Sequence, residues 1–363
     1  MENPLKYFAE LRDPRVERNR EHLLEEVLLI AIAAVLSGAE SWNDIADYGE
    51  AKVVWLRTFL TLPSGIPSHD TFNRVFAALD PEQLEKGFVA WVSSIAKLTS
   101  GEVVAIDGKA LCGTREAGTK AIVHMVSAWA EGNGLVLAQR KVEEKSNEIT
   151  AIPKLLDALE LSGTVVTIDA MGCQRSIAEK IVAKQADYIL AVKENQGSLL
   201  DGIKDSFQML AADAVFEEID CGHGRVESRR CSVLADLSLV EKASQWAGLQ
   251  GLVRIEAERH HKATGKTEHE TRFYITSLKP DAARLNRAIR QHWGIENKLH
   301  WVLDVGFSED RCRKRAGHAA QNFSILNRIA LNLLKQDTSK RGIKGKRLNA
   351  AWNHPYLLKL LGI

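Results

Sequence analysis

Three acidic residues in separate segments of the chain have the types and positions that phosphoryl transfer requires. Asp107 follows the apolar, β-branched segment 103–106, and Asp169 follows a similar segment at 164–168. Glu296 lies in a stretch with helical periodicity. Carboxylates brought together repel one another and are hard to keep ionised unless divalent cations lie between them. The pattern therefore predicts a site that holds Mg²⁺ or Mn²⁺, as a pair of ions, and transfers phosphoryl groups.

Length and composition limit the class of protein. A chain of 363 residues with 45% apolar content can bury a large core in two domains or in one elaborated domain. Its longest apolar run, 27–36, is about half of the ~20 residues that a membrane helix needs. No basic segment followed by an apolar one begins at Met1, so we expect a cytoplasmic protein without a membrane partner.

Positive charge is concentrated near the end of the chain, although the formal net charge is only +1. Residues 311–347 contain eleven Lys and Arg against a single acid, Asp337. Such a segment can release counterions from a polyanion, and this favours double-stranded DNA as the partner. A solvated basic tail at 336–363 is the alternative. The expected phosphate contacts in this part are Arg313, Lys314, Arg315, Lys344, Lys346 and Arg347.

The first hundred residues and the next hundred have different periodicities. Residues 1–98 are typical of short capped helices, which we expect to bind DNA or to form a homodimer on DNA. From residue 101 the pattern changes to β-branched segments and then to alternating strands and helices. This predicts an α/β fold with a mixed sheet flanked by helices. The strands are expected at 103–106, 122–130, 134–142, 164–169 and 188–193, and the helices at 149–161 and 174–184.

In this arrangement Asp107 ends the first strand and Asp169 ends the fourth. Parallel neighbours would bring both carboxylates to one edge of the sheet, where open α/β sheets place their ligands. Residues 200–280 contain further strand-like segments, which either continue the sheet or form a β-rich insertion in a catalytic domain at 101–335. Periodicity alone does not choose between these two arrangements.

Residues 282–303 are typical of a helix with an apolar, aromatic stripe that includes Trp293, Glu296 and Leu299. A carboxylate on such a stripe costs several kcal/mol unless it is neutralised or bound to a cation. His292, Glu296 and His300 are also spaced to hold a transition metal by themselves. Glu309 and Asp310 compete with Glu296 for the third acidic position, but we expect them to form ordinary surface ion pairs.

The order and spacing of several short motifs, taken together, are more specific than any single motif. Sixty-two residues separate Asp107 from Asp169, and 127 separate Asp169 from Glu296. With these motifs the chain resembles, over nearly its whole length, the DDE transposases of bacterial insertion sequences, in the subfamily of the H-repeat-associated proteins. The motifs are residues 65–72, 106–109, 169–171, 192–196, 223–225, 292–297 and 299–301.

The resemblance implies an RNase H-like fold with a β-rich insertion, and a function in DNA transposition. Asp107, Asp169 and Glu296 would then bind the metal ions. The protein would cleave DNA at the element ends and join the 3′-hydroxyl to target DNA. A metal-dependent nuclease without strand transfer and a catalytically inactive, transposase-derived DNA-binding protein are the alternatives.

The sequence around Glu296 departs from a signature of related transposases, in which Tyr, Arg and Lys accompany the glutamate. The corresponding places hold Ile289, His292 and Leu303, so Glu296 alone matches. Either His292 or Arg290 is expected to replace the missing arginine. The further DNA contacts expected outside the basic segment are therefore Lys109, Lys193, His223, Arg225, Arg290 and His292.

Overall fold

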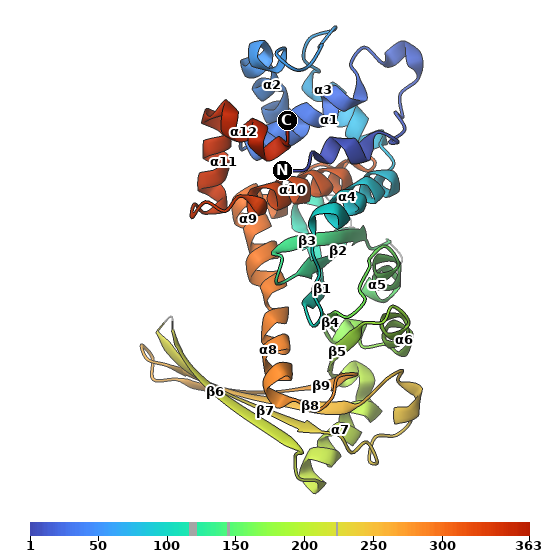
Figure 1. Ribbon diagram of the computed structural model, residues 1–363, viewed down its shortest axis with the longest axis vertical. Helices are drawn as coiled ribbons and strands as arrows, with labels where there is room; N and C mark the ends of the chain where they lie inside the picture. The colour runs from blue at the N-terminus through green and yellow to red at the C-terminus, as the bar shows by residue number, and fades with distance from the viewer. Residues whose placement is uncertain (116–121, 144–145, 223) are drawn as a thin grey trace.

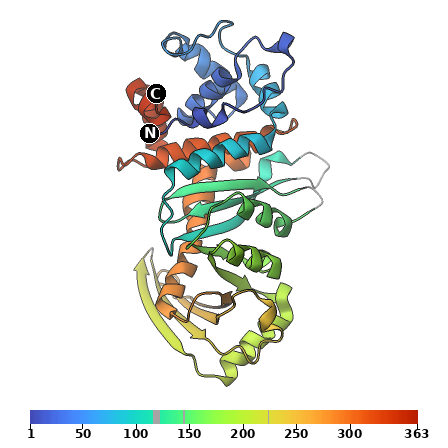
Figure 2. The ribbon, with the colours of Figure 1, turned by 45° about the vertical axis from the view of Figure 1, so that its right-hand side comes forward.

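The computed structural model describes residues 1–115, 122–143, 146–222 and 224–363. Helices gather at one end of an elongated molecule, where both termini lie, and the sheet extends to the other end (Figures 1 and 2). Nine strands of the described residues form one sheet in the order β3-β2-β1-β4-β5-β9-β8-β7-β6. None of the helices in this part of the chain is long and apolar enough to cross a membrane.

The helical end contains the first four helices and the last three helices of the chain. α1 is apolar on nearly all sides and is buried, whereas α2 begins at a capping box formed by Ser41 and Asp44. α10 (Ala319–Gln336) packs against α1, α3 and α4, so the two ends of the chain share one core. The first four helices are α1 (Leu24–Leu36), α2 (Trp42–Leu56), α3 (His69–Ala78) and α4 (Pro81–Ile95).

Residues 336–363 do not form the basic tail that their charge suggested. They fold into α11 (Ile343–Trp352) and α12 (His354–Leu361), which pack against α1 and α10. The apolar side chains of Leu357 and Leu360 are buried there, and this burial holds the segment in the helical end.

The mixed sheet flanked by helices confirms the predicted fold class. β1 pairs antiparallel with β2 and parallel with β4, and β4 pairs parallel with β5. β2 pairs with β1 as far as Leu111, so Asp107 lies inside β1 opposite Ser127 and not at its end. The elements are β1 (Val103–Leu111), β2 (Val123–Ala130), β3 (Leu135–Lys141), α5 (Glu148–Asp157), β4 (Val165–Ile168), α6 (Arg175–Ala183) and β5 (Asp187–Val192).

The β-rich region continues the same sheet. β9 pairs antiparallel with β5, and β8, β7 and β6 follow it outward. The two arrangements left open by the periodicity are thus combined, because the inserted strands extend the central sheet. Their bounds are α7 (Gly197–Met209), β6 (Ala214–Gly222), β7 (Arg225–Leu234), β8 (Gly251–His261) and β9 (Thr267–Thr276).

The helix expected at 282–303 is interrupted. α8 (Ala282–His292) is followed by a π-helical turn, Ile295–His300, and then by α9 (Trp301–Phe307). A π-helical turn contains more residues than an α-helical turn and so changes which side chains share a face. Ile295 and Leu299 are buried, but Glu296 is exposed. Glu296 therefore leaves the apolar stripe, and the cost predicted for a buried carboxylate does not apply to it in full.

Candidate active site

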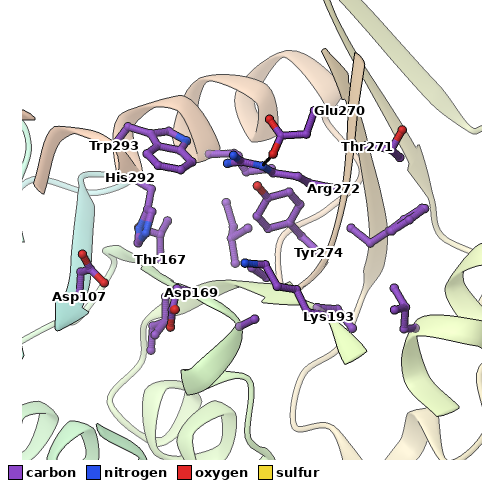
Figure 3. A pocket seen from close by; sticks show the side chains of 18 of the residues that line it. Asp107, Thr167, Asp169, Lys193, Glu270, Thr271, Arg272, Tyr274, His292 and Trp293 are labelled. Atoms are coloured by element: carbon purple, nitrogen blue, oxygen red, sulfur yellow. Dashed lines mark hydrogen bonds and ion pairs between the residues drawn. The ribbon is translucent and has the colours of Figure 1, made fainter. Parts of the chain in front are cut away.

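The three predicted acids line one cavity of about 570 Å³. Ile106 of β1 lies opposite Ile168 of β4, so the next residues, Asp107 and Asp169, come side by side at this edge, as predicted. Glu296 reaches the same cavity from the π-helical turn. Figure 3 shows the two aspartates on one side of the cavity and Trp293 with Arg272 on the other.

The pKa of Asp107 is strongly raised in this site. Burial raises the pKa of Asp107 to about 7, with further increases from the negative charges of Asp169, Glu148 and Glu296 and a decrease from the Gly108 backbone amide. Partial burial also raises the pKa of Glu296, and the Arg272 guanidinium opposes this rise. The carboxylates are thus close enough to repel one another, as the sequence predicted.

The donors suit a hard divalent cation, because all three offer carboxylate oxygens. Their mutual repulsion is also the kind that a bound cation relieves. Among the described residues, however, no three His, Cys, Asp or Glu side chains are placed to hold a metal ion. Asp107, Asp169 and Glu296 would therefore have to move closer together to hold one.

Two histidines lie beside the carboxylates. The Nδ1 atom of His292 is 2.9 Å from Oγ1 of Thr167, and burial lowers the pKa of His292 to about 4. Nδ1 of His300 is 3.6 Å from Asp107, which is too long for a hydrogen bond, and burial lowers the pKa of His300 to about 3. Both rings are neutral at pH 7, so His292 cannot supply the missing positive charge.

Arg272 adds a positive charge to the cavity that the sequence analysis missed. Its guanidinium lies 4.5 Å from the centre of the Trp293 ring and bonds to Glu270 over 2.6 Å (Figure 3). Arg272 belongs to β9, and only the pairing of β9 with β5 brings it to the cavity. No local signal in the sequence marks that contact.

Gly294, an unexpected residue inside a helical stretch, has a steric explanation. A Cβ atom at this position would collide with the carboxylate of Glu131. Glu131 also accepts a hydrogen bond from Trp129 Nε1 and pairs with Lys298. The glycine therefore lets the π-helical turn approach the end of β2.

Comparisons with known proteins show the family of this chain. A family model described as "Transposase DDE domain" matches residues 99–333, and one described as "DDE_Tnp_1-associated" matches residues 5–92. The chain belongs to the DDE transposase family. The resemblance predicted from the motifs is thereby confirmed.

Two full-length relatives of this transposase come from Escherichia coli. "Putative transposase YncI" of strain O157:H7 is 40% identical over 367 residues, covering 98% of this chain and 94% of that protein. "H repeat-associated putative transposase YhhI" of strain K12 is 38% identical over 370 residues, covering 98% and 97%. Among solved structures, "Cryo-EM structure of piggyBac transposase synaptic complex with hairpin DNA (SNHP)" aligns with a TM-score of 0.45 at 12% identity, over 98% of this chain and 76% of that chain.

Two cations predicted to contact DNA, Lys109 and Arg290, form ion pairs within this transposase. Lys109, with 9% of its side chain exposed, pairs with Asp304 and lies 3.7 Å from Asp310. Arg290 pairs with Asp220 over 2.5 Å and with Glu218 over 3.6 Å. The Lys109 side chain is thus mostly buried and neutralised, which argues against a contact with DNA, whereas Arg290 is 39% exposed and stays a predicted contact.

Three members of the basic segment are also structural. Lys346 and Arg347 are each 6% exposed, and they donate to the backbone carbonyls of Leu334 and Val35, respectively. Lys314 donates to the carbonyl of Glu40 and lies 3.4 Å from the centre of the Phe323 ring. Charge counting could not distinguish these side chains from their exposed neighbours, because burial depends on the tertiary fold.

The remaining predicted contacts are exposed, and one cannot be placed. Lys193 lines the cavity itself, whereas Arg225 lies in a neighbouring groove. His223 lies outside the described residues. The exposed members of the predicted set are Lys193, Arg225, Arg313, Arg315 and Lys344.

A groove beside the cavity is lined by six arginines and four glutamates, more arginine than the sequence analysis expected. It shares Arg272, Trp293 and Glu296 with the cavity, so the two hollows meet at the third acid. Its arginines come from three strands of the inserted region and from α8. They are Arg225, Arg229, Arg259, Arg272, Arg287 and Arg290.

Glu309 is not the surface residue that was expected. Its side chain is 1% exposed and accepts a 2.5 Å hydrogen bond from Nη1 of Arg328, which is fully buried. Asp310 is 43% exposed and lies 3.7 Å from Lys109, as expected for an acid in a surface ion pair. Of these acids, only Glu296 lines the cavity with Asp107 and Asp169.

Proposed function

We propose that this protein is an active transposase that cleaves DNA at the ends of an insertion sequence and joins the 3′-hydroxyl to target DNA. The observation that carries the proposal is the convergence of Asp107, Asp169 and Glu296 on one cavity. The order of β1 to β5, with β2 antiparallel to both of its neighbours, β1 and β3, also supports an RNase H-like core.

The carboxylates of Asp107, Asp169 and Glu296 would hold the metal. When bound, a pair of Mg²⁺ or Mn²⁺ ions supplies activation of the attacking oxygen and stabilisation of the leaving oxygen in an in-line displacement. Arg272 and Lys193 line the cavity and can pair with a phosphodiester there. Because a 3′-hydroxyl can replace water as the nucleophile, the same residues would serve both cleavage and joining.

Double-stranded DNA is the partner that the charges favour. The arginine-rich groove continues from the cavity, so a duplex with its scissile bond at Asp107 could extend along it. The protein would act in the cytoplasm, where bacterial DNA lies. A homodimer on DNA stays a prediction, and sedimentation of the complex with and without an end-containing duplex tests it.

Product analysis on a duplex that carries the element's own ends tests the proposal. Wild type should cut the substrate and join the product, whereas Asp107→Asn or Asp169→Asn should bind the ends without cutting them. Cutting without joining would indicate a nuclease, and binding without cutting would indicate an inactive derivative. Cleavage by either Asn variant at nearly the wild-type rate would refute the assignment of the aspartates.

A further inference from the structure

A fourth acid lies beside Asp107 and Asp169. Glu148 is the first residue of α5, a helix that packs against β2 and β3, and its side chain is half-buried. Its negative charge acts on Asp107, and that of Asp169 acts on Glu148. The three carboxylates are therefore mutual neighbours, although Glu148 was not singled out by its position in the sequence.

Gly108 shows where the carboxylate of Glu148 lies. A Cβ atom built on Gly108 would collide with Oε1 and Cδ of Glu148, so the carboxylate occupies the space of a side chain at position 108. Gly108 does not have a positive φ, and the strand conformation alone does not require glycine there. The glycine next to Asp107 admits the carboxylate of Glu148 to this part of β1.

An acid in the first turn of a helix commonly stabilises the helix through its dipole. Glu148 differs from such an acid because its carboxylate reaches across to β1 and approaches two other carboxylates. Among the described residues, the charge that acts on Glu148 is that of Asp169, and no cation opposes it. Placing three acids together without a cation is costly, and a divalent ion between them removes that cost.

We propose that Glu148 is a further carboxylate of the metal site, which binds the cation together with Asp107 and Asp169 once the three side chains move closer together. The inference rests on the proposed function, because it assumes that these aspartates bind a metal. It assigns to α5 a direct part in the site, in addition to β1, the end of β4 and the π-helical turn.

Titration with Mn²⁺, followed by the electron paramagnetic resonance signal of the free ion, tests the inference without DNA or turnover. Glu148→Gln should weaken Mn²⁺ binding at least about tenfold relative to wild type. Glu25→Gln is the matched control, because Glu25 is an exposed acid in the first turn of α1. Asp107→Asn reports on the site itself.

The outcomes separate the two claims. Loss of binding in Asp107→Asn with wild-type affinity in Glu148→Gln would overturn the role of Glu148 and leave the proposed function standing. Equal affinities in wild type and Asp107→Asn would instead refute the metal site on which the proposal depends. An equal loss in Glu25→Gln and Glu148→Gln would assign the effect to helix stability and overturn the inference.

Gly108→Ala provides a second test that removes no charge. The added methyl group should displace the carboxylate of Glu148 and weaken Mn²⁺ binding to a similar extent. In a Glu148→Ala background the same substitution should have little further effect, because the side chain that it displaces is gone. Full additivity of the two losses would overturn the proposal.

Discussion

Replacing Glu309 should destabilise the protein without abolishing its DNA nicking. Glu309 and Arg328 are 1% and 0% exposed, and 2.5 Å separates their bonded atoms. Glu309→Gln would leave the Arg328 guanidinium buried without its counter-charge. Loss of one partner of a buried ion pair typically costs about 3–5 kcal/mol of the free energy of unfolding. Such a loss is a large part of the about 5–15 kcal/mol that holds a typical domain folded.

Thermal unfolding measures this effect directly. With about 1.3 °C of Tm for each kcal/mol in a chain of this length, Glu309→Gln should lower the Tm by about 4–7 °C. The double variant Glu309→Leu, Arg328→Met should recover much of this loss, because apolar replacement of a buried pair is often neutral. Oε2 of Glu309 and the Nε and Nη2 atoms of Arg328 also lack hydrogen-bond partners among the described residues. Removing these unsatisfied polar atoms favours that recovery.

The comparison with DNA nicking makes the test specific. At a temperature where it remains folded, Glu309→Gln should nick an end-containing duplex at a rate close to that of wild type, because Glu309 does not line the cavity. A Tm within about 1 °C of wild type would refute the argument from the buried pair. Loss of nicking in a fully folded variant would show that Glu309 acts in the site.

Two other predictions concern charge. The raised pKa of Asp107 means that the folded, metal-free protein holds a proton up to about pH 7 that the unfolded chain releases near its ordinary value of 3.8. The free energy of unfolding should therefore fall as the pH rises between these values, by up to about 4 kcal/mol. Asp107→Asn should flatten the dependence of Tm on pH. Identical slopes of Tm against pH in wild type and Asp107→Asn would contradict this. Replacing the exposed cations of the basic segment with Gln should reduce the slope of log affinity for DNA against log salt by up to about 0.9 per lost contact, whereas Lys346→Gln should leave that slope unchanged. Binding isotherms at several salt concentrations decide this, and an unchanged slope in the first variant would show that the segment makes no phosphate contacts. The exposed cations are Arg313, Arg315 and Lys344.

The positions of the aspartates could be predicted because local signals determine them. β-Branched segments precede both residues, and the alternation of strands and helices after Asp107 implies that their strands are parallel neighbours. Family motifs then identify Glu296 as the third acid. These signals depend on residues that are close in the sequence, where periodicity and turn chemistry are informative.

Contacts between distant segments could not be predicted in the same way. Arg272 meets Trp293 because β9 joins the sheet beside β5, and Glu309 meets Arg328 in the core between two helical segments. Helical periodicity placed Glu296 on the apolar stripe because it assumes α-helical turns, whereas a π-helical turn exposes this side chain. Burial likewise removes Lys346 from the accessible charges.

The central claim is that Asp107, Asp169 and Glu296 act together in one active site. Nicking of an end-containing duplex in Mg²⁺ by wild type, Glu296→Gln and Asp310→Asn tests it most directly, with Tm values as the control for folding. Glu296 is exposed, so Glu296→Gln should keep nearly the wild-type Tm but lose cleavage, whereas Asp310→Asn should retain much of it. Nicking by Glu296→Gln at the wild-type rate, together with its loss in folded Asp310→Asn, would contradict the account.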